Sequence, residues 1–320
     1  MRLLVVGGAG YIGSHTVYEL VRAGHDVVVM DNLSTGSSTM VHPDAGFIKG
    51  DVTVKDDVRK AFSKGPFDVV MHFAAKIVVP ESVSDPLSYY HNNVEGVRVL
   101  LEGMKEAGTT KIVFSSTAAV YGEANGICDE NSPTVPINPY GETKLACEKM
   151  IRWVSAAEGF SYVIFRYFNV AGADASGKIG LLHDHITHLI PVAIQAALGM
   201  RDHLSIFGTD YPTEDGTCVR DYIHVTDLAK AHVLGAGHLL AGGTSETMNL
   251  GSNKGFSVLE VAKEVDRLMP LRTVMDQRRP GDPAVLVASN DKAGQVLGWK
   301  PERSLSDIVR SDLAFRQSHK

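Results

Sequence analysis

Two residues that could share a proton lie four positions apart, Tyr140 and Lys144 in the segment YGETK. Residues at this spacing lie on one face of a helix, and Asn138, Pro139 and Glu142 predict that a helix begins here. A tyrosine ordinarily has a pKa of about 10, and a neighbouring cation stabilises its phenolate. The pair therefore predicts a general base, although a surface pair at this spacing is the alternative reading.

A hydroxyl group is expected to join this pair from Ser115-Ser116-Thr117, at the end of an apolar segment. In a doubly wound sheet such a strand end faces the start of the following helix. Hydroxyl, phenol and ammonium together suit hydride transfer at a secondary alcohol, in which the hydroxyl orients the substrate oxygen, the phenolate takes its proton and a bound cofactor takes the hydride. Local capping by serine and threonine is the alternative.

The segment LLVVGGAGYIG, from Leu3 to Gly13, is an apolar strand that runs into a glycine-rich turn. Its glycines fit Gly7-x-x-Gly10-x-x-Gly13, and the G-x-G-x-x-G fingerprint when read from Gly8. Free N–H groups and the positive end of the next helix would bind a pyrophosphate, whereas a tight strand-to-helix connection is the alternative. Asp31 ends the second expected strand, where a carboxylate binds the adenosine ribose and repels a 2′-phosphate, so NAD is favoured over NADP.

The elements that must position these groups alternate as strand and helix through the first half of the chain. This alternation predicts an α/β fold with a doubly wound, Rossmann-like parallel sheet. The expected strands are 3–7, 26–31, 47–50, 68–73, 111–116 and 162–167, and the expected helices are 14–23, 57–62, 87–107 and 139–157.

The regular alternation ends after about Val170. We expect strands at 219–224 and 248–250, helices at 225–239, 258–268 and 305–315, and a turn-rich insertion at 204–217. Residues 1–170 are thus predicted to form the NAD-binding domain, with segments such as 219–250 returning to it. Residues 171–320 are predicted to form mainly a smaller, mixed α/β substrate domain.

Composition excludes several other classes of function. The 320 residues carry a net charge of −6 with no cluster of Lys and Arg, which argues against nucleic-acid and anionic-membrane partners. The chain has no C-x-x-C motif among its three cysteines, Cys128, Cys147 and Cys218, so neither a disulfide framework nor a zinc site is expected. We expect a reducing, cytoplasmic location instead. No signal peptide or membrane span is expected. His183, His185 and His188 form H-x-H-x-x-H without a fourth ligand, so no metal is predicted.

The motifs together resemble a known family. The glycine turn, the hydroxyls at 115–117 and Tyr140-x-x-x-Lys144 resemble the extended short-chain dehydrogenase/reductase superfamily. The resemblance to its UDP-glucose 4-epimerase family continues through most of the chain, in the segments YFNV (167–170), HLIP (188–191), IFGTDYPT (206–213), VRDYIHV (219–225) and RRPGD (278–282).

The resemblance implies site residues position by position. Those implied to hold NAD are Gly7, Gly10, Tyr11, Ile12, Gly13, Asp31, Asn32, Leu33, Ser34, Thr35, Gly36, Asp51, Val52, Phe73, Ala74, Ala75, Lys76, Ile77, Asn92, Thr117, Tyr140, Lys144 and Phe168. Those implied to hold a UDP-sugar are Thr117, Tyr140, Asn169, His188, Ser205, Ile206, Phe207, Arg220 and Arg279. The planar guanidinium of an arginine suits a diphosphate, with surface ion pairs as the alternative role.

The implied reaction interconverts UDP-galactose and UDP-glucose, with Thr117, Tyr140 and Lys144 as the catalytic residues. Tyr140 takes the proton of the sugar 4-hydroxyl, C4 gives its hydride to NAD, the 4-ketose turns over, and the hydride returns to the other face. The resemblance also implies a homodimer, paired through the helices at 87–107 and 139–157, and a role in galactose metabolism.

Departures from the wider pattern narrow this expectation. Nucleotide-sugar dehydratases carry an Asp-Glu pair where this chain has Ala118 and Ala119, so dehydration loses its general acid. Many relatives carry this lysine one place later, at the position of Ile77, so the position of Lys76 departs from the family pattern.

Leu286 stands where, in relatives, a bulky aromatic residue closes the sugar pocket to N-acetyl groups and a small residue opens it. A 4-epimerase of UDP-GlcNAc, UDP-GalNAc or a UDP-uronate therefore stays open, as does a non-catalytic NAD-sensing protein.

Overall fold

The structure is a computed structural model that describes residues 1–124, 126–182, 186–278 and 282–319. The chain divides into two compact units, each with its own hydrophobic core. Unit 1 comprises Met1–Gly122, Thr134–Arg166 and Ala229–Met248. Unit 2 comprises Glu123–Pro133, Tyr167–Leu228 and Asn249–Lys320.

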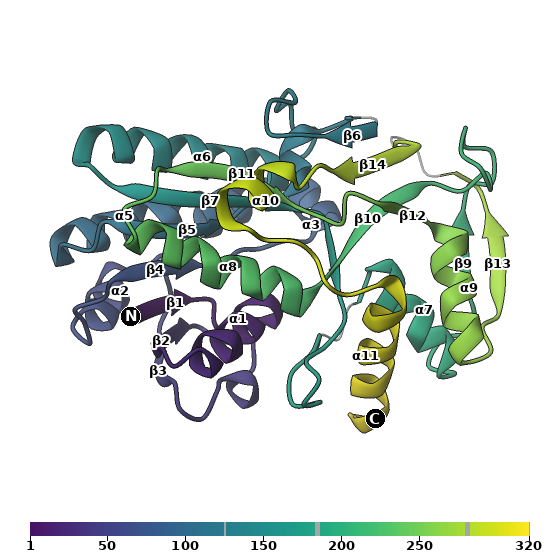
Figure 1. Cartoon of the computed structure of the whole chain (residues 1–320), viewed down its shortest axis with the longest axis horizontal. Coiled ribbons are helices and arrows are strands. Elements are labelled where there is room, and N and C mark those ends of the chain that lie inside the picture. Colours follow the sequence, from purple (N-terminus) through teal and green to yellow (C-terminus); the bar gives the residue numbers. More distant parts are fainter. Residues whose placement is uncertain (125, 183–185, 279–281, 320) are drawn as a thin grey trace. The chain divides into compact units, whose positions relative to one another are not determined.

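Unit 1 is organised around a seven-stranded sheet with the order β11-β7-β5-β4-β1-β2-β3 (Figure 1). Its strands are β1 (Arg2–Val6), β2 (Asp26–Asp31), β3 (Gly46–Lys49), β4 (Val69–His72), β5 (Lys111–Ser115), β7 (Ser161–Tyr167) and β11 (Glu246–Leu250). The pairings from β7 to β3 are parallel, and β1 lies between β2 and β4. The predicted doubly wound sheet is confirmed, and the strand order reverses at β1, where such sheets bind ligands.

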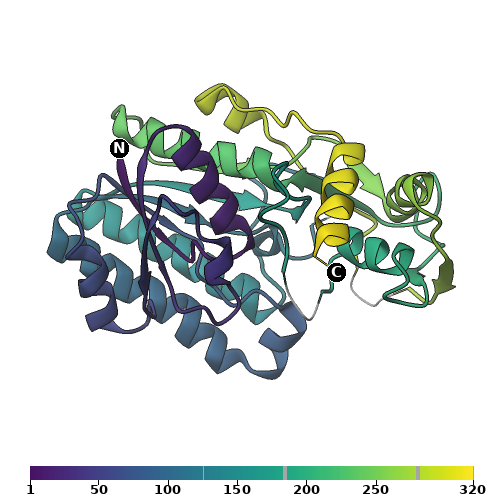
Figure 2. The same ribbon diagram turned by 90° about the horizontal axis from the view of Figure 1, so that it is seen from below.

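Helices cover both faces of this sheet. They are α1 (Tyr11–Arg22), α2 (Lys55–Phe62), α3 (Val79–Ser84), α4 (Pro86–Tyr89), α5 (Gly96–Ala107), α6 (Pro139–Glu158) and α8 (Val225–Leu240), with short helical turns at Ser38–Met40 and Ala118–Tyr121. Figures 1 and 2 show α1 and α8 on one face and α2, α5 and α6 on the other. Side chains of the second face pack in one apolar cluster with alternate residues of β1, β2, β4 and β5, as the period-two pattern of a strand requires.

The single helix expected over 87–107 is wrong in detail. The structure has α4, then a π-helical segment η2 (Tyr90–Glu95), then α5. Asn93 lies inside the π segment, where its buried carboxamide accepts from the N–H of Lys76 at 2.8 Å and donates to Thr143 at 3.0 Å. These side-chain bonds to neighbouring segments compete with a regular helical turn, and π segments of this kind are concentrated at functional sites.

Unit 2 contains a five-stranded sheet and a two-stranded sheet. Four strands of the larger sheet have the order β12-β10-β14-β6, and β8 pairs with β10; the smaller sheet consists of β13 and β9. Its strands are β6 (Gly126–Cys128), β8 (Asn169–Ala171), β9 (Leu204–Phe207), β10 (Val219–His224), β12 (Gly255–Ser257), β13 (Thr273–Asp276) and β14 (Val285–Ala288). Its helices are α7 (Leu189–Ala197), α9 (Val258–Leu268), α10 (Asp291–Leu297) and α11 (Leu305–Ser318). The mixed α/β character expected here is confirmed.

Several of these strands escaped the sequence prediction because they contain only three or four residues, too few for a period-two pattern to stand out. The strand at 219–224 and the helix at 258–268 match β10 and α9. Among the helices of the described part of the chain, none combines the length and apolar character that membrane crossing requires.

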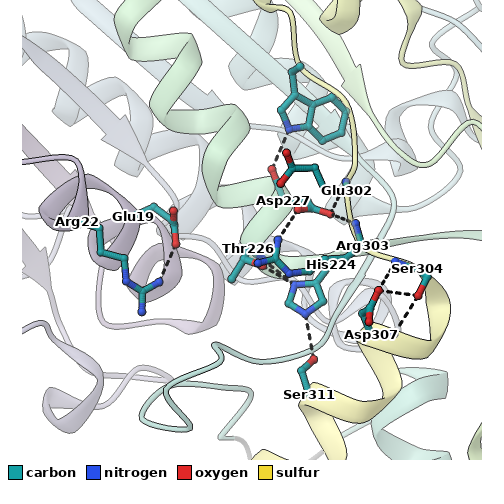
Figure 3. Close-up of polar contacts among 11 residues, drawn as sticks. Glu19, Arg22, His224, Thr226, Asp227, Glu302, Arg303, Ser304, Asp307 and Ser311 are labelled. Atoms are coloured by element: carbon teal, nitrogen blue, oxygen red, sulfur yellow. Dashed lines mark hydrogen bonds and ion pairs between the residues drawn. The ribbon is translucent and has the colours of Figure 1, made fainter.

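Within unit 2, a buried carboxylate in the first turn of α8, that of Asp227, holds the C-terminal segment (Figure 3). Asp227 accepts from the N–H groups of Glu302 and Arg303 at 3.0 and 2.9 Å and from the Arg303 guanidinium at 2.7 Å. The indole of Trp299 donates to the carbonyl of Asp227 at 2.9 Å. This network anchors the loop that leads into α11.

Candidate active site

Gly7 and Gly13 are required by the packing of the turn itself. Gly7 follows β1 with a φ of +81°, and a Cβ there would lie 2.4 Å from the backbone nitrogen of Ala74. A Cβ at Gly13 would lie 2.2 Å from the carbonyl oxygen of Gly7. Both distances are shorter than a carbon atom tolerates, so α1 approaches the end of β1 only because these two positions are glycine.

Gly10 differs, because nothing in the described chain occupies the space of its missing side chain. A Cβ there would meet only the Gly7 carbonyl oxygen, at 3.4 Å. Gly10 is the N-cap residue of α1; no side chain caps this helix, and its first turn has no acidic residue. The N terminus of such a helix suits an anion, so the turn has the form of a phosphate cradle that a side chain at residue 10 would fill.

Asp31 holds the shape of this cradle. Its buried carboxylate accepts from the N–H of Ala9 at 2.9 Å and from the N–H of Leu33 at 2.8 Å. Each carboxylate oxygen has two acceptor positions, so both oxygens retain capacity for a ligand hydroxyl. Leu33 has a φ of +61°, a left-handed conformation that costs a non-glycine residue roughly 1–2 kcal/mol. Strain of this kind is concentrated at ligand sites.

The ends of β2 and β3 are joined by side chains. Asn32 donates from Nδ2 to Asp51 at 3.0 Å and accepts from the N–H of Ser34 at 2.9 Å. Burial opposes ionisation of Asp51, but hydrogen bonds from Thr53 and Asn32 prevail and lower the pKa of its carboxyl. Asn32, Ser34 and Asp51, three of the residues predicted to hold the cofactor, therefore form one hydrogen-bonded edge.

The segment after β4 passes beside Gly7 and is fixed by Asn93. The N–H groups of Phe73 and Ala74 both donate to the carbonyl of Val6, at 2.8 and 3.2 Å. The ammonium of Lys76 donates to Glu81 and Ser88, each at 3.2 Å, and lies 5.6 Å from the ring centre of Tyr89. Ala75 and Ile77 flank Lys76. Asn92, which the sequence predicted as a cofactor ligand, donates to the side chain of Asn93 at 2.9 Å.

The three hydroxyls at the end of β5 have three different partners. Ser115 pairs with the ring of His232 at 3.4 Å, and Ser116 donates to Glu148 at 2.5 Å. Thr117 caps the next turn by accepting from the N–H of Ala119 at 3.1 Å, and its side chain is hydrogen-bonded to Tyr140. Of the three candidate hydroxyls, Thr117 is thus the one that meets the phenol.

The start of α6 brings Tyr140 to this hydroxyl. Asn138 caps the helix by accepting from the N–H of Gly141 at 2.9 Å, with Pro139 in the first turn, so the predicted helix start is confirmed. A Cβ at Gly141 would lie 2.6 Å from the carbonyl oxygen of Ala119. The absence of that atom lets α6 pack directly against the turn that Thr117 caps.

The pKa of Tyr140 differs from the sequence expectation. Burial raises the pKa of its phenol, and the hydrogen bond with Thr117 acts in the opposite direction. The sequence predicted that Lys144 would lower this pKa. The reason for the difference is geometric, because the Lys144 ammonium is directed to the carbonyl of Ser115, at 2.8 Å, and lies 5.0 Å from the ring centre of Phe114.

Lys144 is buried and loses its proton at a lower pH than an exposed lysine does. Burial lowers the pKa of its ammonium to about 8, although Cys147 and Glu148 raise it in part. His72 stays neutral because burial and the charge of Lys144 lower its pKa to about 3. A phenol, a hydroxyl bonded to it and a cation one helical turn further along form a group able to move one proton.

Two residues predicted to bind substrate share one face of the unit 2 sheet. Asn169 on β8 is in register with Tyr222 on β10, and its side chain donates to the carbonyl of Asp221 at 3.0 Å. Arg220, two residues before Tyr222, is on the same face and in register with Leu286 of β14. The predicted phosphate ligand and the residue singled out for sugar specificity are therefore cross-strand neighbours.

The guanidinium of Arg220 is held by acceptors of unit 2. It donates to the carbonyls of Val219 and Pro283 at 2.9 and 2.8 Å and pairs with Asp282 at 3.4 Å. The Asp282 side chain is 38% exposed, so this ion pair is weak. The ion pair that was considered as the alternative role of this arginine is therefore present. It is weaker than the paired hydrogen bonds that a guanidinium forms with a phosphate.

The remaining predicted residues are placed as follows. His188 is the N-cap residue of α7, Ser205, Ile206 and Phe207 belong to β9, beside β13, and Phe168 lies between β7 and β8. Arg279, His183 and His185 lie outside the described residues. Within the described ranges, no group of three or more His, Cys, Asp and Glu residues is arranged to hold a metal ion.

Sequence reasoning missed the buried polar residues that form hydrogen bonds with the segments around this cluster. Asn93, Glu148 and Arg166 are each at most 3% exposed, and each has a polar side chain with several partners. One signal was available for Glu148, which falls on the same helical face as Leu145 and Ile151, an otherwise apolar stripe. Asn93 and Arg166 carry no comparable local signal.

Comparison with known proteins places this geometry among relatives. Residues 3–251 match the model of the NAD dependent epimerase/dehydratase family. The chain is 48% identical over 323 residues to the UDP-glucose 4-epimerase of Lacticaseibacillus casei, covering 100% of this chain and 98% of that protein.

Two solved structures are similar throughout. One is the UDP-glucose 4-epimerase from Brucella ovis in complex with NAD, with a TM-score of 0.95 and 43% identity, covering 98% of this chain and 97% of that one. The other is the UDP-Glc/GlcNAc 4-epimerase from Campylobacter jejuni, with a TM-score of 0.88 and 39% identity, covering 99% of each chain.

Proposed function

Because this chain belongs to the NAD dependent epimerase/dehydratase family, we propose that it interconverts UDP-galactose and UDP-glucose. It is an isomerase that inverts C4 of a UDP-sugar with NAD as its cofactor. The observation that carries the proposal is the cluster of Thr117, Tyr140 and Lys144 at the carboxyl end of the unit 1 sheet. Full-length similarity to UDP-glucose 4-epimerases supports the same reaction.

The residues of unit 1 fit an NAD molecule. The open face of Gly10 and the uncapped start of α1 suit the pyrophosphate, and the free acceptor positions of Asp31 suit the ribose hydroxyls. We assign cofactor binding to residues 1–170 and substrate binding mainly to residues 171–320. When bound, NAD accepts and returns a hydride and adds a positive charge that favours the phenolate of Tyr140.

The chain's own residues then have four tasks. Tyr140 receives the proton of the sugar 4-hydroxyl at its phenolic oxygen and returns it after the 4-ketose has turned over. Thr117, bonded to the phenol, lowers its pKa and orients the sugar oxygen. Lys144 contributes a cation within one turn of the phenol. Asn169 and Arg220 hold the nucleotide, so that the sugar alone changes orientation.

Dehydration is the other reaction of this family, and the chain lacks the residues for it. Ala118 and Ala119 follow Thr117, and a methyl group supplies neither an acid nor a base to expel water from the sugar. Epimerisation needs only the single proton carrier that Tyr140 provides.

The proposal is tested with the purified protein, UDP-galactose and no added NAD. Appearance of UDP-glucose is expected, because the cofactor stays bound through turnover, and Tyr140→Phe is expected to be inactive while retaining its fold. If the wild-type protein forms no UDP-glucose even with NAD supplied, the proposed function is wrong.

A second candidate activity concerns N-acetylated sugars. Leu286 lies in register with Arg220 and is intermediate in size between the residues that close and open the pocket in relatives. The Campylobacter jejuni relative is named for both UDP-Glc and UDP-GlcNAc. The same assay with UDP-GalNAc decides whether this chain shares the second activity, and Leu286→Tyr is expected to abolish it while sparing UDP-galactose.

We further infer a homodimer. Leu87 on α4 and Trp153 on α6 are 80% and 76% exposed, and these two helices pack against each other in unit 1. Apolar side chains this exposed suit a self-complementary interface between two copies. Sedimentation is expected to give a dimer, and Leu87→Asp with Trp153→Asp a monomer, whereas Met200→Asp, at another exposed apolar residue, leaves the dimer intact.

We also infer a cytoplasmic location. Cys128, Cys147 and Cys218 are all buried free thiols, the state that a reducing compartment maintains. Cell fractionation is expected to recover the protein with the cytoplasmic markers, and recovery in a membrane or secreted fraction would contradict this location.

A further inference from the structure

A buried ion pair lies directly behind the proposed catalytic cluster, within unit 1. Glu148 on α6 is 0% exposed and Arg166 on β7 is 3% exposed. The Arg166 guanidinium donates from Nε and Nη2 to the two carboxylate oxygens of Glu148 at 2.9 and 2.6 Å, and Arg152 adds a third bond at 2.9 Å. Desolvation makes such a pair a poor source of net stability, so its presence points to another role.

The pair holds the chain on both sides of Thr117. Ser116 donates from its hydroxyl to Glu148 Oε1 at 2.5 Å. On the other side, Arg166 donates from Nη1 to the hydroxyl of Tyr121 at 3.1 Å. Thr117 is therefore fixed between two anchor points, one residue before it and four residues after it, and both lead to the same ion pair.

The same carboxylate also lies one helical turn beyond Lys144. Both side chains belong to the buried face of α6, and the ammonium of Lys144 donates to the carbonyl of Ser115, the residue before Ser116. Glu148 thereby contacts the short segment that positions both Thr117 and Lys144. We propose that Glu148, paired with Arg166, is a positioning residue for the Thr117–Tyr140–Lys144 cluster; this role rests on the proposed function.

Besides holding the chain in position, Glu148 acts on Lys144 through its charge. The titratable groups that bear on Lys144 are Cys147 and Glu148 on α6 and His72 on β4. His72 is neutral, and burial raises the pKa of the Cys147 thiol to about 12, so neither carries charge at neutral pH. Glu148 is the carboxylate in this group, and its charge keeps the pKa of Lys144 higher than burial alone would set it.

Glu148→Gln separates these effects from simple packing, because glutamine keeps the shape and one acceptor oxygen but loses the charge. We expect kcat for UDP-galactose to fall about 100-fold, as small displacements of catalytic groups do, with KM changed by less than about threefold. We also expect the alkaline decline of kcat to move to lower pH, because Lys144 would lose its proton earlier. A purely structural role would leave that decline in place.

Ser116→Ala is the second variant, since it leaves the ion pair intact and removes only the tether to Thr117. Its kcat is expected to fall about tenfold, with the pH profile unchanged. Asp227→Asn is the control, because the buried carboxylate of Asp227 also pairs with an arginine, Arg303, at 2.7 Å, and its hydrogen bonds lead to residues 299–303 instead of the proposed site (Figure 3). It is expected to lower Tm while leaving kcat and the pH profile at wild-type values.

The outcomes distinguish this inference from the proposed function. A wild-type protein without epimerase activity contradicts the proposed function. An active wild type together with a folded Glu148→Gln variant of unchanged kcat and pH profile overturns the positioning role alone. Should Glu148→Gln fail to fold, Ser116→Ala decides, and an unchanged kcat in that variant overturns the inference.

Discussion

The proposed catalytic side chains of unit 1 and the proposed phosphate ligand of unit 2 are held in different ways. In unit 1, Thr117 and Lys144 are 8% and 3% exposed, and each is fixed by a hydrogen bond within the same unit. In unit 2, Arg220 pairs at 3.4 Å with Asp282, a carboxylate whose side chain is 38% exposed. The first arrangement leaves little freedom. In the second, Arg220 also donates to two backbone carbonyls, but its ion pair with Asp282 is weak enough to exchange for a ligand.

This difference fits the two tasks that we propose for these groups. Groups that transfer a proton must hold their geometry to fractions of an ångström. Burial and multiple hydrogen bonds provide that geometry, although burial costs desolvation energy. Groups that capture a diphosphate must give up their existing partner, and a partly exposed ion pair does so easily. If this contrast holds, changes in unit 1 should act on kcat, and changes in unit 2 on KM.

The largest effect is expected for Lys144→Met. Methionine fills a similar buried volume but removes the cation near Tyr140, so kcat is expected to fall about 1,000-fold with little change in KM. Steady-state kinetics with UDP-galactose measure both constants. A variant that raised KM as much as it lowered kcat would contradict the assignment of Lys144 to the chemical step.

The next largest effect is expected from a matched pair in the glycine turn. Gly10 has a φ of −81°, which alanine adopts, and its Cβ would meet the Gly7 carbonyl oxygen at 3.4 Å. Gly10→Ala is therefore expected to keep its Tm but to lose most of its bound NAD, measured by cofactor release on denaturation. Gly13→Ala, whose Cβ would lie 2.2 Å from the same oxygen, is expected to lower Tm sharply. Full NAD retention in Gly10→Ala would show that the turn is only a structural connection.

A smaller effect is expected for Arg220→Met in unit 2. Loss of a charged hydrogen bond costs about 1.5–3 kcal/mol, so KM for UDP-galactose should rise about 10- to 100-fold while kcat changes little. Arg267→Met is the control, because Arg267 forms an exposed pair with Glu264 at 2.6 Å on α9. A fall in kcat without a rise in KM for Arg220→Met would remove the contrast between the units.

The smallest effect is expected from pH. Burial lowers the pKa of Lys144 from 10.5 to about 8, so kcat should fall about tenfold per pH unit above that value as the ammonium disappears. The pH dependence of stability has the opposite sign to that of kcat. Between about 8 and 10.5 the unfolded chain binds more protons at this lysine than the folded one, so the contribution of Lys144 to stability rises with pH. Lys144→Met should lack both trends.

Local pattern was sufficient for most of unit 1. Strand β2 matched its predicted bounds, and Asn138 and Pro139 marked the start of α6, because caps and periodic apolar residues depend on neighbours a few positions away. The helix over 87–107 was wrong in detail because Asn93 bonds to Lys76 and Thr143, residues far away in sequence. The short strands of unit 2 form through pairing with distant partners, which no local window contains.

The sequence by itself determined the fold class, the glycine turn, the pairing of a tyrosine with a lysine at helical spacing, and the family. These depend on residue type and short spacing, and physics constrains both locally. Residue types and spacing left Ser115, Ser116 and Thr117 equivalent, and the family resemblance singled out Thr117; the tertiary structure shows this residue beside the phenol and Lys144 turned to a backbone carbonyl. It also revealed Glu148 and Arg166 behind the cluster. Burial and the choice among nearby hydrogen-bond partners depend on contacts between distant segments, and these exist only once the chain has folded.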